Sequence, residues 1–329
     1  MAELTTDHDT LVATYTGGLA PVEGSVPAFA GSERLRSDGR PRPEIRAELR
    51  RIPDARNAVV VTLTLLAPVA IVWGAVTVDH WLGWIAAFVL MGTVFPRMFI
   101  LNHEAAHRLL FSNRAVNDFV GEKILGWIPF GDGGNVYRLI HTQHHRDEFG
   151  PKEPDFALYA KYPISRASFR RKMLRDASGV SGWKNLKPAL RGLFREGYRR
   201  RALRFLSGQA LVFALFALAG HPWLYLFLWF LPWMTYWRVV NRLRALAEHG
   251  GMTRSPDRRR TTHHIDQHLP ARFLFVPFNV GYHLAHHVDS GIPMWNLPKL
   301  HAALVDDGYL PDDLVHRNYP AFWRTLVRR

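Results

Sequence analysis

The chain has 329 residues, of which 48% are hydrophobic and 12% aromatic, and this composition excludes a disordered or fibrous protein. It contains no cysteine, which excludes disulfides, thiolate-held iron–sulfur clusters, cysteine nucleophiles and cysteine-type zinc fingers. The formal net charge is +14, but no nucleic-acid recognition motif accompanies it, so we do not expect a nucleic-acid-binding protein.

The first 55 residues are predicted to lie outside the main domain. Residues 1–30 are rich in Thr, Gly, Ala and Pro and carry acidic side chains from Glu3 onward. They lack the basic start and the apolar run of a signal peptide. Residues 34–56 are basic. We therefore expect residues 1–55 to be a flexible tail followed by a basic segment beside a membrane.

Four apolar runs follow, and each is long enough, or nearly so, to cross the ~30 Å hydrocarbon core of a bilayer. The first contains no charged residue, and the second contains only Arg97, near its end. The other two are shorter, with Gln209 inside the third and Arg238 at the end of the fourth. The predicted spans are residues 58–78, 81–101, 205–220 and 223–240.

Short linkers join these runs in pairs, so each pair is predicted to form a tight helical hairpin. The linkers are Asp79-His80 and His221-Pro222. Both ends of each hairpin then face the same side of the membrane. The fold class we expect is all-α, an integral membrane protein with four transmembrane helices in two hairpins and a cytosolic helical cap. The alternative is a soluble α protein in which these helices form the core.

The basic residues indicate which side is cytoplasmic. Residues 161–204 contain fourteen Lys and Arg against Asp176 and Glu196, interleaved with apolar residues. This pattern predicts amphipathic helices on an anionic membrane surface. Residues 34–56 and 242–260 are basic as well. The positive-inside rule therefore places both termini in the cytoplasm, and we expect this chain to lie in a bacterial inner membrane.

The stretch NHEAAHRLLF, at the end of the second run, has two interpretations. His103, Glu104 and His107 match the HExxH pattern of zinc proteases, in which the glutamate activates a water. The same residues also fit a helix that donates two imidazoles to a larger metal site. The sequence around this motif alone leaves both interpretations open.

The other histidines favour the larger site. Nine of the seventeen fall in four clusters, and the HxxHH pattern, expected by chance only about 0.05 times here, occurs twice. Residues i, i+3 and i+4 lie on one face of a helix, so each HxxHH directs three imidazoles toward one point. All clusters lie outside the predicted spans. They are His103 and His107; His141, His144 and His145; His249; and His283, His286 and His287.

Nine imidazoles are too many for one ion. A zinc ion takes three or four protein ligands, whereas two iron ions with four or five ligands each would use all nine histidines. A protease built on HEAAH would leave six of them without a role. In this interpretation Glu104 becomes a hydrogen-bonding partner of a ligand rather than a general base. A non-enzymatic metal transporter or store is disfavoured, because the spans hold almost no ionisable residues.

HEAAH, HTQHH and HLAHH, in this order around two hydrophobic hairpins, resemble the three histidine boxes of the membrane fatty acid desaturase and hydroxylase superfamily. His249, after the fourth span, is similar to the extra histidine of many members. The resemblance covers about residues 56–300, which we expect to form the desaturase-like domain, with residues 301–329 completing a cytosolic cap. It implies a di-iron oxidase that cycles between Fe²⁺ and Fe³⁺ and uses O₂ as co-substrate.

The resemblance also implies a partner and a substrate. The chain has no His-Pro-Gly-Gly haem-binding motif, so electrons should come from a separate ferredoxin, rubredoxin or cytochrome. The substrate should be a long acyl chain that enters from the membrane. Acyl desaturation is the leading interpretation. Hydroxylation or ketolation of acyl chains, alkanes or carotenoids is the alternative, because the outcome depends on sub-ångström placement of the substrate.

Several polar residues near the boxes could orient the imidazole rings. Other histidines, such as His301 and His316, are expected to be ordinary surface or interface residues. His263, His264 and His268 in THHIDQH lie in a charged segment, and we expect them to be solvated. The candidate orienting residues are Glu104, Asp147, Glu148, Asp155, Glu248 and Asp289, and Asn279 is a candidate to hold a water near one iron.

Overall fold

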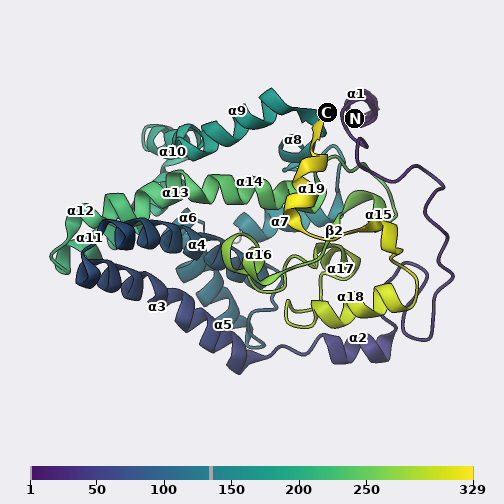
Figure 1. The fold of residues 1–329 in the computed structure, drawn as a ribbon, viewed down its shortest axis with the longest axis horizontal. Coiled ribbons are helices and arrows are strands. Elements are labelled where there is room, and N and C mark those ends of the chain that lie inside the picture. Colours follow the sequence, from purple (N-terminus) through teal and green to yellow (C-terminus); the bar gives the residue numbers. More distant parts are fainter. Residues whose placement is uncertain (1, 133–135, 329) are drawn as a thin grey trace. The chain divides into compact units, whose positions relative to one another are not determined.

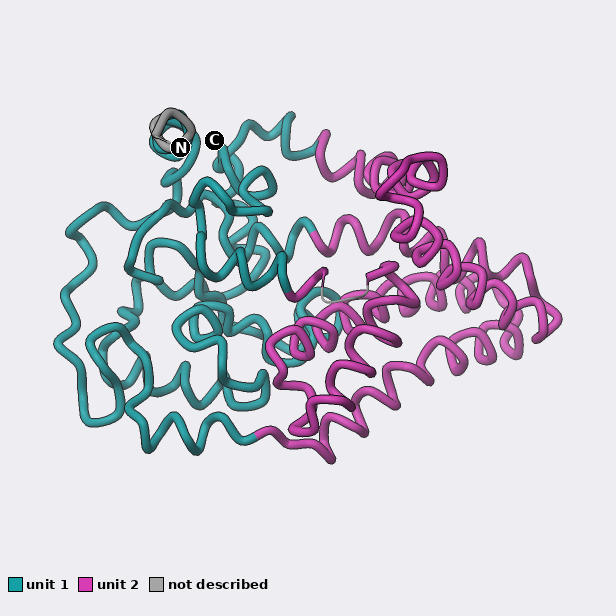
Figure 2. The backbone as a smooth tube through the Cα atoms, turned by 180° about the vertical axis from the view of Figure 1, so that it is seen from behind, with its two compact units in different colours: residues 1–51, 139–170, 242–329 teal, residues 52–138, 171–241 magenta. Residues whose placement is uncertain are grey.

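The computed structural model describes residues 2–132 and 136–328, and these are mostly helical (Figure 1). The chain divides into two compact units, which Figure 2 shows in different colours. Unit 1 comprises residues 1–51, 139–170 and 242–329, and unit 2 comprises residues 52–138 and 171–241. Within these described residues, the helical prediction holds apart from four strands of two residues each, all in unit 1.

Unit 2 contains three helices that are long and apolar enough to cross a membrane: α3 (Asp54–Val78), α4 (Trp81–Ala106) and α11 (Arg199–Leu218). Only 17% of the most apolar window of α3 is buried. Large apolar side chains such as Val69 and Trp73 are 66% and 71% exposed. Such a surface is costly in water and favourable in lipid, so these helices indicate an integral membrane protein.

The first predicted hairpin is present. Helix α3 ends at Asp79, whose left-handed backbone (φ 39°) turns the chain back. The His80 ring then caps α4 by accepting a hydrogen bond from the backbone N–H of Leu82 at 3.3 Å. Helices α3 and α4 pack along each other, as the two-residue linker predicts.

The fourth predicted span is not a single helix. Residues 223–240 are divided among α12 (Pro222–Leu224), the π-helix η2 (Tyr225–Phe230), α13 (Leu231–Met234) and α14 (Tyr236–His249), with a break at Thr235. Pro232 follows η2 and has no N–H to donate, which interrupts the regular hydrogen-bond ladder. Helix α11 still packs against α12 and η2. A second hairpin therefore exists, but in the described residues only three helices, and not four, are long enough to span a membrane.

Gln209, the polar residue inside α11, is fully used in packing this hairpin. Its Nε2 donates to the carbonyl oxygen of Ile128 at 3.1 Å. Its Oε1 accepts from the Tyr225 hydroxyl and from Trp229 Nε1, both at 3.2 Å. The buried amide thus links three segments of unit 2, which explains why a polar group is tolerated within an apolar helix.

The basic stretch is helical, as predicted. It forms α9 (Arg166–Ala177), α10 (Val180–Gly192) and the start of α11. Helix α10 packs on α11, and Gly208 of α11 lies where a Cβ would meet the carbonyl oxygens of Trp127 and Ile128 at 2.9 Å. Only glycine permits this close approach. The other elements of unit 2 are α5 (Arg114–Asp118), η1 (Phe119–Gly126) and α6 (Trp127–Phe130), while α7 (Val136–Arg146), α9 and α14 include residues of both units.

Unit 1 is built from short helices joined by two parallel strand pairs. Strand β1 pairs with β4, and β2 pairs with β3 in the register His264 to Val315. Helix α19, near the C-terminus, is capped by the Asn318 side chain, which accepts from the backbone N–H of Ala321. The elements of unit 1 are α1 (Ala2–Tyr15), α2 (Pro43–Leu49), α8 (Phe156–Tyr159), β1 (Ile164–Ser165), α15 (Arg258–Thr261), β2 (His264–Ile265), α16 (Leu269–Leu274), α17 (His283–Val288), α18 (Leu297–Asp306), η3 (Asp312–Leu314), β3 (Val315–His316), α19 (Tyr319–Thr325) and β4 (Val327–Arg328).

The N-terminal segment packs onto the rest of unit 1 instead of extending from it. Arg46 pairs with the buried Asp289, and Arg34 pairs with Asp307. Leu35 is fully buried. These contacts connect the chain before α3 to the segment that carries the third histidine box.

Candidate metal centre

The second histidine box lies on α7. Its residues 141, 144 and 145 follow the i, i+3, i+4 spacing, so one side of the helix carries all three imidazoles. His141 and His144 are buried, and His145 is partly buried. The sequence prediction that this box is helical is confirmed.

The third box forms α17, a helix of six residues that begins at His283 itself. Every residue of this helix is buried, and His286 has no exposed surface. Three adjacent buried imidazoles on one short helix are unusual, because buried polar groups need partners. The arrangement therefore calls for ligands or hydrogen-bond partners inside unit 1.

Four histidines of unit 1 form a first ligand set: His144, His249, His283 and His287. All four are buried, and each offers a ring nitrogen within 4.8 Å of the others. The Nε2 atoms of His249 and His283 are 3.2 Å apart. Two of the boxes and the isolated His249 predicted from sequence thus meet in one place.

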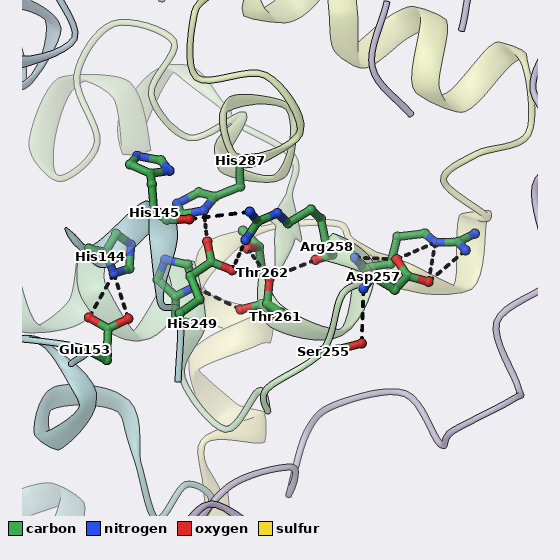
Figure 3. A network of polar contacts seen from close by, with 12 residues as sticks. His144, His145, Glu153, His249, Ser255, Asp257, Arg258, Thr261, Thr262 and His287 are labelled. Atoms are coloured by element: carbon green, nitrogen blue, oxygen red, sulfur yellow. Dashed lines mark hydrogen bonds and ion pairs between the residues drawn. The ribbon is translucent and has the colours of Figure 1, made fainter. Parts of the chain in front are cut away.

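In three of these four histidines, a ring nitrogen contacts an oxygen atom of the protein (Figure 3). His144 Nδ1 lies 3.0 Å and 3.1 Å from the two carboxylate oxygens of Glu153. His249 Nδ1 lies 2.9 Å from the carbonyl oxygen of Thr261. His287 Nδ1 forms an ion-pair contact with Glu148, which also pairs with Arg258.

These contacts determine the tautomers. A carbonyl or carboxylate oxygen can only accept, so Nδ1 of His144 and of His249 must carry the proton. In their neutral form, these two rings then keep a lone pair on Nε2 that can bind a metal. This is the arrangement in which a carboxylate or carbonyl orients a metal-bound imidazole, and the donor set fits a metal ion.

Burial also favours the neutral, metal-binding form of these rings. It lowers the pKa of His249, His283 and His287 well below the usual value of a histidine. Burial has the same effect on His144, but the hydrogen bond and charge of Glu153 outweigh it and raise the pKa of that ring. A bound cation would replace the additional proton, because metal and proton compete for the same nitrogen.

A second group of imidazoles in unit 1 comprises His141, His145 and His286. His145 Nε2 lies 3.0 Å from His141 Nε2 and 3.1 Å from His286 Nε2. A proton can join only one pair of these three nitrogens at a time. A shared cation would satisfy all three lone pairs, so this group also fits a metal ion.

The first histidine box lies in unit 2, at the end of α4. The His103 and His107 rings are one turn apart, with centroids separated by 4.8 Å. His103 and Glu104 are both buried, and His103 Nδ1 is 3.8 Å from the Glu104 carboxylate. Glu104 thus lies beside a predicted ligand, and its orienting role stays a prediction.

The end of α4 is held in place by two side chains of unit 2. Asn117 donates to the carbonyl oxygen of Ala105 at 2.9 Å, and Arg138 donates to the carbonyl oxygens of Ala105 and Ala106 at 3.1 Å and 3.0 Å. These bonds satisfy carbonyl groups that have no partner within the helix. They fix the turn from which His103 and His107 project.

The other candidate orienting residues have different partners. Glu248 is 3.6 Å from His283 Nδ1 and pairs with Arg244, whereas Asp155 lies next to Glu153, whose Oε1 accepts from the Asp155 backbone N–H at 3.0 Å. Asp289 pairs with Arg46, and Asp147 accepts from the backbone N–H of Lys152. Asn279 is buried, and its backbone carbonyl oxygen accepts from the backbone N–H of Tyr282.

Two features were missed by sequence reasoning. Glu153 and Thr261 hold His144 and His249, and only the position of Glu153 in the Glu-Pro-Asp motif after the second box could have indicated its role.

The prediction that THHIDQH is solvated is wrong for two residues, since His263 and His264 are 4% and 1% exposed. His268 is exposed and contacts the carbonyl oxygen of Arg317. Tertiary packing of β2, which the local sequence does not reveal, accounts for the difference.

Comparison with known proteins finds a matching family and several relatives. The family model described as fatty acid desaturase matches residues 79–320, which contain all nine histidines. The sn-1 oleoyl-lipid 12-desaturase of a Picosynechococcus species is 25% identical over 73% of this chain and 75% of its own length. The dihydrorhizobitoxine desaturase of Bradyrhizobium elkanii is 26% identical over 78% and 75%, and the chloroplastic omega-6 fatty acid desaturase of Glycine max is 24% identical over 67% and 56%.

Proposed function

This chain belongs to the fatty acid desaturase family, and from that premise we propose that it is an O₂-dependent di-iron enzyme that introduces a double bond into a long acyl chain of a membrane lipid. The observation that carries the proposal is the first ligand set, in which four buried imidazoles each offer a ring nitrogen within 4.8 Å of the others, while Glu153 and the Thr261 carbonyl oxygen hold Nδ1 of His144 and His249. The relatives named as acyl-lipid and fatty acid desaturases support an acyl substrate.

We assign the nine histidines to two iron ions. His144, His249, His283 and His287 would hold one, and His141, His145 and His286 would hold the other. His103 and His107 are proposed as its remaining ligands, on the sequence argument that HEAAH ends a span and presents two imidazoles. Zinc proteolysis is not retained, because the fatty acid desaturase model matches residues 79–320, which include HEAAH.

Iron in such a site supplies the redox chemistry that neither side chains nor zinc can perform on an unactivated methylene group. The overall reaction removes one hydrogen from each of two adjacent methylenes and reduces O₂ to two water molecules. It needs two electrons and two further protons, which we propose come from a reduced carrier protein and from solvent. The chain's own residues keep the imidazoles neutral and oriented and exclude water by burial.

An apolar cavity in unit 2 supports a lipid substrate. It has a volume of about 440 Å³ and is lined by α3, α4, η1, α11 and η2. Its walls are mostly aliphatic and aromatic, with Val69, Trp73, Met98, Val212 and Trp229 among them. A cavity with such walls can hold a hydrocarbon chain, and it presents few polar groups that could bind a polar ligand.

We propose that both termini face the cytoplasm and that the segment from Pro222 to Asn241 makes a fourth, irregular crossing. Non-helical backbone at membrane depth is tolerated where protein covers it. Trp229 and Trp233 in this segment are 2% and 4% exposed, which fits that condition. The basic residues around the hairpins support the orientation.

The test is a mass-spectrometric lipid profile of a host that expresses the chain with a compatible electron donor. We expect new mono-unsaturated acyl chains, which disappear in the His286→Ala variant while its membrane insertion remains. The control is His80→Gln, which changes an exposed histidine in the hairpin turn and should retain activity.

Other results have definite meanings. A gain of one oxygen in the acyl chain would establish the hydroxylase alternative. A wild-type product profile in His286→Ala would refute the assignment of that residue. Desaturation of a substrate other than an acyl chain, which the dihydrorhizobitoxine desaturase makes worth testing, would refute the proposed substrate class.

A further inference from the structure

A third cluster of potential metal ligands lies in unit 1 outside the histidine boxes. It comprises His264 in β2, Asp266 just after that strand, and His301 on α18. Each offers one ligand atom, and these atoms lie within 4.8 Å of one another. We propose that these three residues bind a Zn²⁺ ion, separate from the proposed irons, with water completing the coordination.

Buried atoms without partners are the first argument for this site. His264 is 1% exposed, and neither of its ring nitrogens has a hydrogen-bond partner among the residues the structure describes. The same is true of Nδ1 of His301. A buried imidazole normally donates with one nitrogen and accepts with the other, so two rings that lack these bonds leave several groups unsatisfied. A cation between them would use their lone pairs.

The geometry is close to what zinc needs. His264 Nε2 lies 3.7 Å from Asp266 Oδ1, while two ligands on a tetrahedral zinc ion lie about 3.3 Å apart. The His264 and His301 rings stack with centroids 4.1 Å apart. One ring must therefore rotate about its Cβ–Cγ bond for both lone pairs to point at one ion, and that torsion is soft.

The chemistry of the donors selects the metal. Two imidazoles and one carboxylate suit zinc, whereas Mg²⁺ and Ca²⁺ prefer oxygen ligands alone. Zinc also binds nitrogen and oxygen sites more tightly than Fe²⁺ or Mn²⁺. The Asp266 side chain is 46% exposed, which provides a route for the ion. Burial and the neighbouring His264 lower the pKa of His301 to about 4, so this ring is neutral and able to ligate at physiological pH.

The position of the site suggests a structural role. Strand β2 makes a short pairing with β3, and α18 packs against α17, which carries the third histidine box. Tyr282, directly before α17, contacts the His301 ring with centroids 5.1 Å apart. A zinc ion would therefore join β2 to α18 and stabilise the part of unit 1 that supports the start of α17.

The experiment measures bound zinc per chain by mass spectrometry on the full-length protein in detergent, equilibrated with Zn²⁺ alone. The histidine boxes can also take up zinc, so the informative quantity is a difference between variants. We expect Asp266→Asn and His301→Ala to bind one zinc fewer than the wild type. The same loss should appear when these changes are made in the His286→Ala background, which separates this site from the proposed iron ligands.

The control is His268→Ala, an exposed imidazole on the same segment, which should retain the wild-type zinc count. Added Zn²⁺ should also raise the thermal unfolding midpoint of the His286→Ala protein, and Asp266→Asn in that background should abolish the rise. Asp266→Asn preserves side-chain shape and so covers the case in which His301→Ala does not fold. Wild-type zinc content in both Asp266→Asn and His301→Ala would overturn the proposal, whatever the outcome of the lipid profile.

Discussion

Each imidazole of the first ligand set can bind a metal through only one nitrogen, and the protein selects that nitrogen by what it places against the other. Glu153 and the Thr261 carbonyl oxygen hold the Nδ1 protons of His144 and His249. The choice matters because a ring with the opposite tautomer would direct an N–H at the ion. The residues that set the tautomers are thus as important to the proposed centre as the ligands themselves.

We expect Glu153→Gln to lower iron affinity by about 10- to 100-fold, since the amide keeps the shape of the side chain but removes its charge and one acceptor. Iron per chain and the rate of double-bond formation should fall together. Glu196→Gln, a change to an exposed glutamate, is the control. Unchanged iron content in Glu153→Gln would show that this carboxylate does not orient a ligand.

His263 is expected to make unit 1 sensitive to acid. Its Nε2 donates to the Gly250 carbonyl oxygen at 2.7 Å, next to His249, and burial lowers its pKa to about 3. In the unfolded chain the pKa is about 6.5. Between these values only the unfolded state binds the proton, so stability is complete above pH 6.5 and falls by about 1.4 kcal/mol per unit below it.

The His263→Gln variant keeps an amide donor but cannot titrate. When the pH falls from 7.5 to 5.5, the free energy of unfolding should therefore fall by about 1 kcal/mol less in this variant than in the wild type. Denaturant titrations in detergent at the two pH values measure this. Equal losses in both proteins would mean that the protonation of His263 does not contribute to acid sensitivity.

At the scale of elements, local sequence pattern predicts those features that depend on local geometry. The i, i+3, i+4 spacing correctly predicts the helices of the second and third boxes, and the linker Asp79-His80 correctly predicts the first hairpin. The fourth span fails because hydropathy records the apolar run but not the effect of Pro232 on hydrogen bonding. The run is apolar throughout and yet is not one helix.

Pairings across long stretches of chain are the other part that the sequence does not predict. His264 and His301 are far apart in the sequence, and each alone resembles an ordinary polar residue. Their burial follows from the pairing of β2 with β3 and from the position of α18, which are properties of the tertiary fold. Glu153 reaches His144 through the turn after α7, so this pairing also depends on how the chain folds beyond the helix.

The Gln209 amide is the element-scale feature most open to test. Gln209→Leu would leave the Ile128 carbonyl oxygen, the Tyr225 hydroxyl and the Trp229 indole N–H without their present partner. Each buried group left unsatisfied costs about 1–3 kcal/mol, so we expect a clear fall in thermal unfolding midpoint. Leu218→Ala, on a position of α11 that is 86% exposed, should change it little. A variant as stable as the wild type would show that these groups find other partners.

At the scale of the whole molecule, the distribution of charge determines orientation more than it determines fold. Of the net charge of +14, residues 161–204 contribute most, and they lie between the two hairpins. Lysine and arginine near span ends are retained on the cytoplasmic side. Because both hairpins begin and end beside basic segments, one orientation satisfies all of them, and the exposed arginines of that face could attract an acidic electron carrier.

The absence of cysteine from this chain makes the orientation directly testable, because one introduced thiol is the only site for a maleimide label. His80→Cys lies in the exposed turn of the first hairpin, and Ser165→Cys lies in the exposed basic segment. A reagent that cannot cross membranes should label His80→Cys in intact cells with the outer membrane permeabilised, and should label Ser165→Cys only after lysis. If Ser165 is cytoplasmic, the basic segment that contains it faces the same compartment as the proposed electron carrier. Labelling of both positions from outside would mean that the first hairpin and the basic segment do not lie on opposite sides, and the two-hairpin topology would have to be abandoned.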